Sequence, residues 1–147
     1  MAFRDTIKKP YIEDRDNNIF IGIDYPFYKS NGVEGWFAST DTTIKAVKNN
    51  IKMLLNTNKG ERLMQPNLGI GLRKFLYEQY DDEMRITVQN EILDTIKTWL
   101  PFVEIKKIDI SMEETDAIGK NKMSIFILFN IVRDPNTLES IQVEIGE

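Results

Sequence analysis

The side chains of this sequence that could carry out chemistry are carboxylates, lysines, tyrosines and arginines, because its 147 residues include neither histidine nor cysteine. This composition excludes Ser-His-Asp hydrolysis, imidazole acid–base catalysis, thiol nucleophiles and metal sites built from thiolate or imidazole ligands. The best remaining candidates are Glu61, Glu78 and Asp81, three carboxylates around one loop-rich segment. A glycosidase needs two such groups facing each other across the scissile bond, one of them with a raised pKa.

The spacing of these three carboxylates shows nothing specific to a glycosidase. With 23 aspartates and glutamates in the chain, some pair always falls at a plausible separation. We therefore predict a protein that is not an enzyme, that needs no cofactor or metal, and that does not hydrolyse peptidoglycan. Lysozyme-type activity stays the alternative, and replacing Glu61 or Glu78 with Gln would then abolish it.

Aromatic residues could bind either a sugar or another protein. Trp36 and Phe37 are adjacent and lie beside a glycine-rich turn, and we interpret them as part of a protein interface. Trp99 lies on the apolar stripe of an expected helix, so packing in the core is its simpler role.

The composition is that of one globular domain. Hydrophobic residues make up 41% and charged residues 29% of the sequence, and about 150 residues suffice to bury a sizeable core. Residues 1–18 are polar and predict an N-terminal arm that proteases trim first, followed by a single domain over residues 19–147. The net charge of −4, with scattered basic residues, argues against nucleic-acid binding. We also expect no signal peptide and no contact with a membrane, since no run approaches the ~20 apolar residues that span a bilayer.

Helical periodicity occurs in two long segments. The first begins after Asp41, an expected N-cap, and is stopped by Gly60. The second begins at Asp81 or Asp82 and ends at Pro101. The apolar stripes consist of Ile44, Val47, Ile51, Leu54 and Leu55 in the first segment and of Met84, Val88, Ile92, Ile96 and Trp99 in the second.

After the second long helix the apolar pattern changes to the alternation that is typical of strands. The alternation shifts phase across Lys106 and Lys107, which predicts a β-bulge. Residues 123–132 are apolar on both alternating sets, so we expect a central strand that is covered on both faces. A loop over residues 133–137 follows, and then an alternating strand over Leu138–Ile145.

Two shorter elements complete the expected fold. Ile19–Ile23 is a strand candidate, and Leu72 to about Tyr80 is a short helix. The order of the elements predicts an α+β protein, in which two long helices and a short one pack on a small antiparallel sheet, a C-terminal three-stranded meander.

A set of spaced residues resembles the signature of the gpW/gene-twenty-five-like family, which is roughly I-x-x-L-L-x-T-x-x-G-E/S-R-x-x-x-P-x-x-G. The positions that fit it are Ile51, Leu54, Leu55, Thr57, Gly60, Glu61, Arg62, Pro66 and Gly69. Leu72 to Glu78 is similar to the family's L-x-x-x-L-F-E, and Ile21 to Phe27 to an upstream segment of versions in large myophages. The family's Glu-Pro-Arg is replaced by Leu100-Pro101-Phe102, so a partner contact made by that Glu and Arg is absent or rebuilt here.

Within this motif we interpret Gly60, Pro66 and Gly69 as turn formers. Glu61 and Arg62 have two interpretations, a functional charged pair or a structural one. In the structural interpretation, an arginine next to a glycine turn braces the loop by donating hydrogen bonds to backbone carbonyls.

The resemblance implies a structural component of a baseplate wedge of a contractile-tailed bacteriophage, located in the virion's tail baseplate and assembled in the host cytoplasm. The implied partners are other wedge proteins, the tail sheath protein and proteins close to the tail tube, in a hetero-oligomeric assembly where sheath polymerisation starts. Members also occur in type VI secretion and related injection machines. Because some relatives carry a lysozyme name and a bacterial anti-adaptor shares the fold, the alternatives are a glycosidase and a regulatory binding protein.

The C-terminal strand is the expected partner-binding element. A three-stranded meander leaves an edge strand with unpaired N–H and C=O groups, and no proline interrupts residues 140–145. We predict that an extended arm of a sheath or wedge protein adds beside it, with Ile141, Val143 and Ile145 in the interface. Replacing Val143 with Pro should block this addition if that N–H faces outward. The alternative is that the chain's own strand at Ile19–Ile23 covers the edge.

Overall fold

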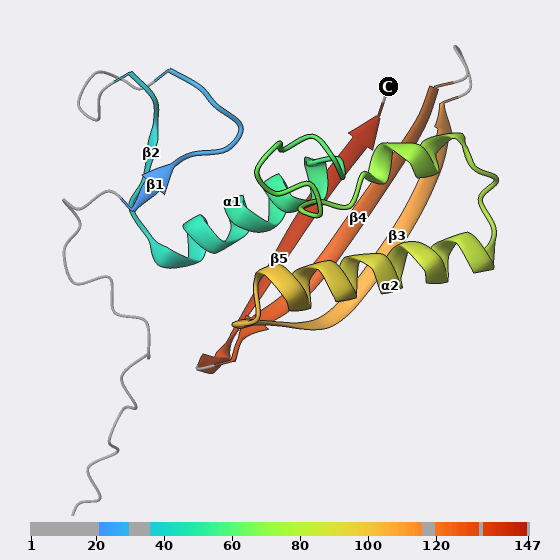
Figure 1. Cartoon of the computed structure of the whole chain (residues 1–147). Coiled ribbons are helices and arrows are strands. Elements are labelled where there is room, and N and C mark those ends of the chain that lie inside the picture. Colours follow the sequence, from blue (N-terminus) through green and yellow to red (C-terminus); the bar gives the residue numbers. More distant parts are fainter. Residues whose placement is uncertain (1–20, 30–35, 116–119, 133, 147) are drawn as a thin grey trace, which may run out of the picture.

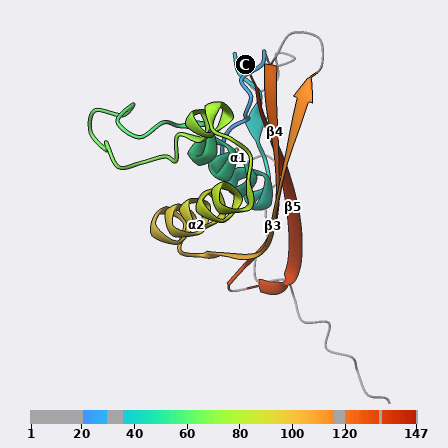
Figure 2. The same ribbon diagram turned by 90° about the vertical axis from the view of Figure 1, so that its right-hand side faces the viewer.

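The computed structural model describes residues 21–29, 36–115, 120–132 and 134–146, and in it the helices lie on one face of a three-stranded sheet (Figures 1 and 2). The elements are β1 (Gly22–Ile23), β2 (Ser39–Thr40), α1 (Thr43–Asn56), the 3-10 helix η1 (Leu72–Tyr77), α2 (Asp82–Trp99), β3 (Val103–Thr115), β4 (Lys120–Ile131) and β5 (Asp134–Gly146). The predicted mixture of helices with a three-stranded antiparallel meander is confirmed. The predicted arm over residues 1–18 lies outside the described residues.

Helix α1 begins and ends slightly inside the predicted limits. Its N-cap is Thr42 rather than Asp41, without a capping hydrogen bond from the side chain. It ends at Asn56 because Thr57 turns to an extended conformation. The Thr57 hydroxyl donates to the carbonyl of Met53 at 2.7 Å, which satisfies one of the free carbonyls at the helix end.

Helix α2 starts where its acidic cap predicts. The Asp81 carboxylate accepts a hydrogen bond from the N–H of Met84 at 2.7 Å, and this bond satisfies one of the unpaired donors of the first turn. Its predicted stripe is buried apart from Trp99, which is partly buried, and Val88 and Ile92 are fully inaccessible to solvent. The short helix before it is a 3-10 helix that ends at Tyr77, earlier than the predicted Tyr80.

The large sheet has the order β3-β4-β5 with antiparallel pairs throughout. The register shifts between Ile105 and Lys107, so Lys106 is the extra residue of the predicted bulge, which is confirmed. Strand β5 begins at Asp134, so most of the predicted loop over residues 133–137 belongs to the strand. The pairing is irregular there, with a register shift between Asn130 and Ile131.

Among the described residues, helices cover only one face of this sheet. The inward residues of β4 are buried under the helices, with Phe129 at 0% exposure, and Figure 2 shows α1, η1 and α2 on the same side of the sheet. On the opposite face Phe126 is 37% and Val132 56% exposed. The prediction that β4 is covered on both faces is therefore wrong, because the helices all pack on one side.

Strands β1 and β2 form a second, two-stranded sheet that was not predicted. Gly22 pairs with Thr40 and Ile23 with Ser39, and Figure 1 shows this hairpin beyond the N-terminal end of α1. The described part of the predicted Ile19–Ile23 strand thus pairs with β2 and not with β5. No helix among the described residues is long and apolar enough to cross a membrane.

Candidate interaction site

The family motif forms a loop between α1 and η1 whose turns require glycine. Gly60 has a φ of 86° and Gly69 a φ of 103°, values that side chains with a Cβ rarely adopt. A Cβ on Gly69 would also lie 2.2 Å from the carbonyl oxygen of Thr57. This close approach lets the chain return to the end of α1, where the N–H of Ile70 donates to the same carbonyl at 3.0 Å.

Glu61 belongs to the internal structure of this loop. Its carboxylate accepts a hydrogen bond from the backbone N–H of Asn58 at 2.8 Å. The N–H of Gly60 donates to the carbonyl of Pro66 at 2.7 Å and closes the loop at its neck. Glu61 therefore fits the structural interpretation.

Arg62 behaves differently. In the described part of the chain its guanidinium makes no hydrogen bond and no ion pair; only its backbone carbonyl is used, accepting from the N–H of Gln65 at 3.1 Å. The bracing role considered for Arg62 is therefore absent from the described residues. Its side chain instead lines a pocket.

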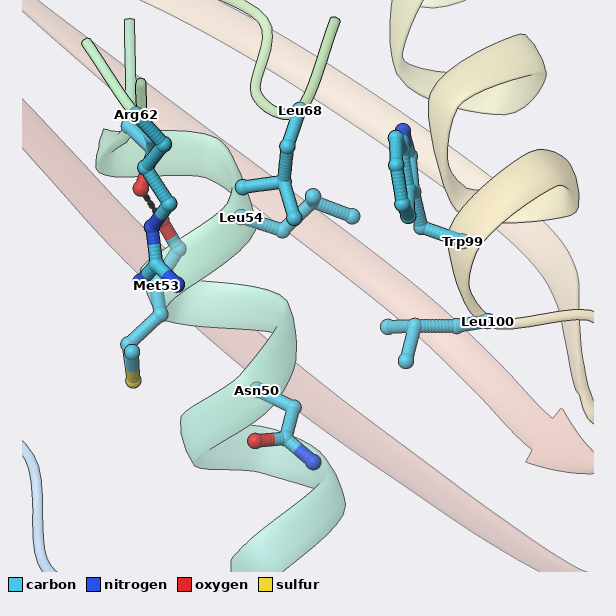
Figure 3. A pocket seen from close by; sticks show the side chains of 8 residues that line it. Asn50, Met53, Leu54, Arg62, Leu68, Trp99 and Leu100 are labelled. Atoms are coloured by element: carbon cyan, nitrogen blue, oxygen red, sulfur yellow. Dashed lines mark hydrogen bonds between the residues drawn. The ribbon is translucent and has the colours of Figure 1, made fainter. Parts of the chain in front are cut away.

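This pocket lies between the end of α1, the loop and the end of α2, and has a volume of about 190 Å³. Figure 3 shows apolar side chains converging on it from these three segments. The lining residues are Asn50, Met53, Leu54, Thr57, Arg62, Leu68, Trp99 and Leu100. Trp99 packs on the core but is only partly buried, because one side of its ring faces this pocket.

The junction after α2 presents apolar side chains where the family carries charges. Leu100 lines the pocket, and Phe102 is 42% exposed. The backbone fixes the turn, since the N–H of Val103 donates to the carbonyl of Leu100 at 2.9 Å and that of Val132 to the carbonyl of Phe102 at 3.0 Å.

The three candidate carboxylates of a glycosidase are not gathered around a cavity. Glu61 is used within the loop and Asp81 caps α2, while Glu78 is exposed after η1. None of the three lines the pocket described above or the two wider hollows along α2. Among the residues that the structure describes, no group of three acidic side chains could hold a metal ion.

The side chains of Ile141, Val143 and Ile145 point to the helices and are 3–5% exposed. They are therefore part of the core and are not themselves accessible to a partner. Within the described residues β5 pairs only with β4. The sequence pattern showed the alternation but not which set faces the core.

The N–H of Val143 belongs to the ladder between β4 and β5. Val132, which directly follows β4, donates to Phe102 on the β3 side. Successive backbone groups point to alternate sides of a strand, so the odd-numbered residues of β4 face β5. Ile125, the partner of Val143, is one of these. The N–H of Val143 therefore faces β4, so Val143→Pro would not remove an outward-facing donor. By the same alternation, the N–H and C=O groups of Ser140, Gln142 and Glu144 point away from β4, to the side of β5 where no described strand lies.

Trp36 and Phe37 are exposed on the N-terminal hairpin, at 84% and 54%. Phe37 contacts Phe27 edge-to-face, with ring centroids 6.3 Å apart. Phe27 and Ile23 are themselves more than half exposed. The hairpin thus carries an apolar surface, which is consistent with the predicted interface and lies apart from the β5 edge (Figure 1).

A buried carboxylate that the sequence analysis missed holds this hairpin on α1. Asp24 is 3% exposed and accepts hydrogen bonds from the hydroxyl of Thr40 at 3.0 Å and the amide of Asn49 at 3.1 Å. Its other oxygen accepts from the hydroxyl of Tyr28 at 2.7 Å and pairs with the ammonium of Lys45 at 2.6 Å. We call these five residues the Asp24 clasp.

The clasp favours the ionised form of Asp24. Burial by itself would raise the pKa of this carboxyl, but the hydrogen bonds from Lys45, Tyr28, Asn49 and Thr40 outweigh burial and hold the pKa well below its ordinary value. The hydrogen bond to Asp24 likewise raises the pKa of Lys45. One feature of the sequence could have indicated a buried carboxylate: Asp24 is the one charged residue of the segment Ile19–Tyr28.

Comparisons with known proteins agree on one family and one fold. Residues 42–136 match the family model described as baseplate wedge protein gp25. No curated protein sequence matches the chain significantly.

Three solved structures share the fold at low sequence identity. A putative tail lysozyme from Geobacter sulfurreducens is 21% identical, with a TM-score of 0.57 over 72% of this chain and 92% of that one. A chain of the anti-feeding prophage baseplate is 20% identical, with a TM-score of 0.54 over 83% and 81%. A chain of the type VI secretion system baseplate complex is 19% identical, with a TM-score of 0.50 over 70% and 92%.

Proposed function

Starting from the family of baseplate wedge proteins described as gp25, to which this chain belongs, we propose that the protein is a non-enzymatic part of a contractile-tail baseplate wedge. In this role it joins other wedge proteins near the tail tube and offers a strand edge on which the sheath begins to polymerise. Assembly takes place in the host cytoplasm, and the finished location is the tail baseplate.

The observation that supports the proposal is the edge of β5, which among the described residues has no strand beside it on the side away from β4. Its outward N–H and C=O groups lie on residues 140, 142 and 144, whose side chains are exposed on the uncovered face. An extended arm of a sheath or wedge protein can add here as a fourth strand through main-chain hydrogen bonds. Because Ile141, Val143 and Ile145 are buried under the helices, the added strand would lie beside them in the plane of the sheet.

The direct test replaces Gln142 with Pro. This change removes an N–H that faces the edge and leaves the ladder to β4 intact, so the melting temperature should fall only slightly. Gln142→Thr keeps the N–H and is the matched control. We expect baseplates that carry Gln142→Pro to initiate sheath at a tenth of the control rate or less. Normal sheath growth on such baseplates, with the proline variant folded, would refute strand addition at this edge.

Val143→Pro is unsuitable for that purpose. It would break a hydrogen bond of the β4–β5 ladder and remove a buried side chain at once. Loss of sheath growth in this variant would therefore report unfolding rather than a lost partner contact.

The glycosidase alternative is favoured only by the name of one structural relative. We expect no peptidoglycan hydrolysis above background from the purified protein, and no change in this respect for Glu61→Gln or Glu78→Gln. Clear turnover that either substitution abolishes would show that the non-enzymatic part of the proposal is wrong.

A further inference from the structure

Two large apolar side chains stand at the tip of the loop between α1 and η1. Leu63 is 96% and Met64 94% exposed, the highest values for large hydrophobic residues in the described part of the chain. Figure 2 shows this loop projecting from the helical layer, away from the sheet. Single exposed apolar residues are common on protein surfaces, but an adjacent pair with almost no intramolecular contact on a projecting loop is a feature of its own.

The loop is held in shape below this tip. The bond from the N–H of Gly60 to the carbonyl of Pro66 closes its neck around residues 61–65. Within it, the Glu61 carboxylate accepts from the N–H of Asn58, and the carbonyl of Arg62 accepts from the N–H of Gln65. The tip therefore does not have to be ordered when it binds a partner, which removes part of the entropic cost of association.

An ion pair also ties the loop to α2. The ammonium of Lys59 lies 2.6 Å from the carboxylate of Glu91, which Lys74 approaches from the other side at 3.1 Å. Burial would raise the pKa of Glu91, but the hydrogen bonds from the two lysines outweigh burial and lower it. The two lysines are half exposed, so these ion pairs add only a small contribution to holding the loop on the helical layer.

Arg62, the residue before the apolar pair, carries a guanidinium that no described residue neutralises. A guanidinium binds a carboxylate through two parallel hydrogen bonds and does so best where water is excluded. The guanidinium lines the pocket at the end of α1 and does not stand at the tip. The complement of this loop is therefore an apolar hollow for Leu63 and Met64, with a carboxylate at its rim that reaches Arg62 at the base of the loop.

We propose that Leu63 and Met64 insert into an apolar pocket on a different protein of the baseplate, and that a carboxylate at the rim of that pocket pairs with Arg62. This inference rests on the proposed function, since it takes the partner to be a baseplate protein, but it does not depend on the β5 edge. A second copy of this chain is a poor host. Its own apolar pocket is lined by Arg62, so insertion would bring two guanidinium groups together.

The test uses tail particles assembled without this chain, to which the purified full-length protein is added. We expect Leu63→Ser combined with Met64→Ser to weaken binding at least about tenfold without lowering the melting temperature. Arg62→Glu should weaken binding more than Arg62→Gln, and Arg62→Lys should retain most of it. Ile86→Ser, which removes a 56% exposed apolar side chain on α2, is the matched control and should bind like the wild type.

The outcomes separate this inference from the proposed function. Wild-type binding by the folded double variant, or an equal loss for Ile86→Ser, would overturn insertion of the tip and leave the baseplate role standing. Failure of the unmodified chain to bind the particles would contradict the baseplate role itself.

Discussion

The helix–sheet unit and the N-terminal hairpin are held together in opposite ways. In the unit, residues such as Phe129 and Ile127 are fully buried between the sheet and the helices, so removal of apolar surface from water supplies its stability. In the hairpin, Ile23, Phe27 and Trp36 face solvent, while the inward group is the Asp24 carboxylate with its hydrogen-bond donors.

This difference suggests how the two regions divide their roles. Residues 42–136, which match the family model, cover most of the helix–sheet unit and leave out the hairpin. A polar clasp fixes the hairpin without using its apolar side chains, which remain available to a partner. If apolar contacts attached the hairpin to α1, the same side chains would be buried in that contact. The clasp depends on charge, and the core does not, so the two regions should respond differently to mutation and to pH.

The largest effect is expected in the core, from Phe129→Ala. Replacing a fully buried Phe should lower the free energy of unfolding by about 3–5 kcal/mol, because transfer and cavity costs add. Phe126→Ala on the uncovered face of the same strand is the control and should cost about 1 kcal/mol or less. Urea denaturation measures both values. Similar losses for the two would show that the outer face is covered after all.

A smaller and local effect is expected from Asp24→Ala. The change leaves the buried hydroxyl of Thr40 without its acceptor and the amide of Asn49 with only the Thr40 hydroxyl as acceptor, which should weaken docking of the hairpin by about 2 kcal/mol. Hydrogen exchange should increase in residues 21–29 and 36–40, with little change in β4. A cooperative loss of protection over the whole chain would contradict the separation of the two regions.

The clasp also predicts how docking depends on pH. Because the pKa of Asp24 is lowered in the folded protein, its contribution is complete above the ordinary carboxyl pKa of about 4 and is lost as the pH falls towards the folded value. Exchange in the hairpin should therefore be constant from neutral pH down to about 5 and rise, relative to β4, below about 4. Asp24→Asn, which cannot ionise, should show weaker docking without this dependence. A parallel change in the wild type and this variant would point to other carboxylates.

The helix–sheet unit was also easier to predict from the sequence than the hairpin. Helix α2 could be predicted because a cap at Asp81 and a regular stripe agree, and the bulge at Lys106 because a phase slip in strand alternation has one common structural cause. Such signals are local. The hairpin depends on Asp24 meeting Asn49 and Lys45, residues that only the tertiary fold brings together.

The surfaces were harder still to predict. Apolar residues on both alternating sets of β4 indicated two covered faces, yet the helices of the described residues cover only one. The pattern cannot distinguish a missing layer from a surface that a partner covers. Likewise the motif marked Glu61 and Arg62 as a pair. The fold uses Glu61 inside the loop, whereas no described residue forms an ion pair with Arg62. Whether a charged side chain forms hydrogen bonds within its own loop depends on the backbone geometry, which the spacing of residues in the sequence does not reveal.

The smallest effect on stability is expected where the hairpin is most exposed. Trp36→Ser combined with Phe37→Ser removes an 84% exposed ring and one edge-to-face contact with Phe27, so the free energy of unfolding should change by about 0.5 kcal/mol or less. Hydrogen exchange at Thr40 should stay slow, because the Asp24 clasp is untouched. If these rings form a partner interface, the same variant should bind tail particles less tightly than the wild type, whereas Asp24→Asn should weaken binding through a misplaced hairpin. Loss of hairpin docking in the Trp36 and Phe37 variant would mean that apolar contacts, and not the clasp, hold the hairpin in place.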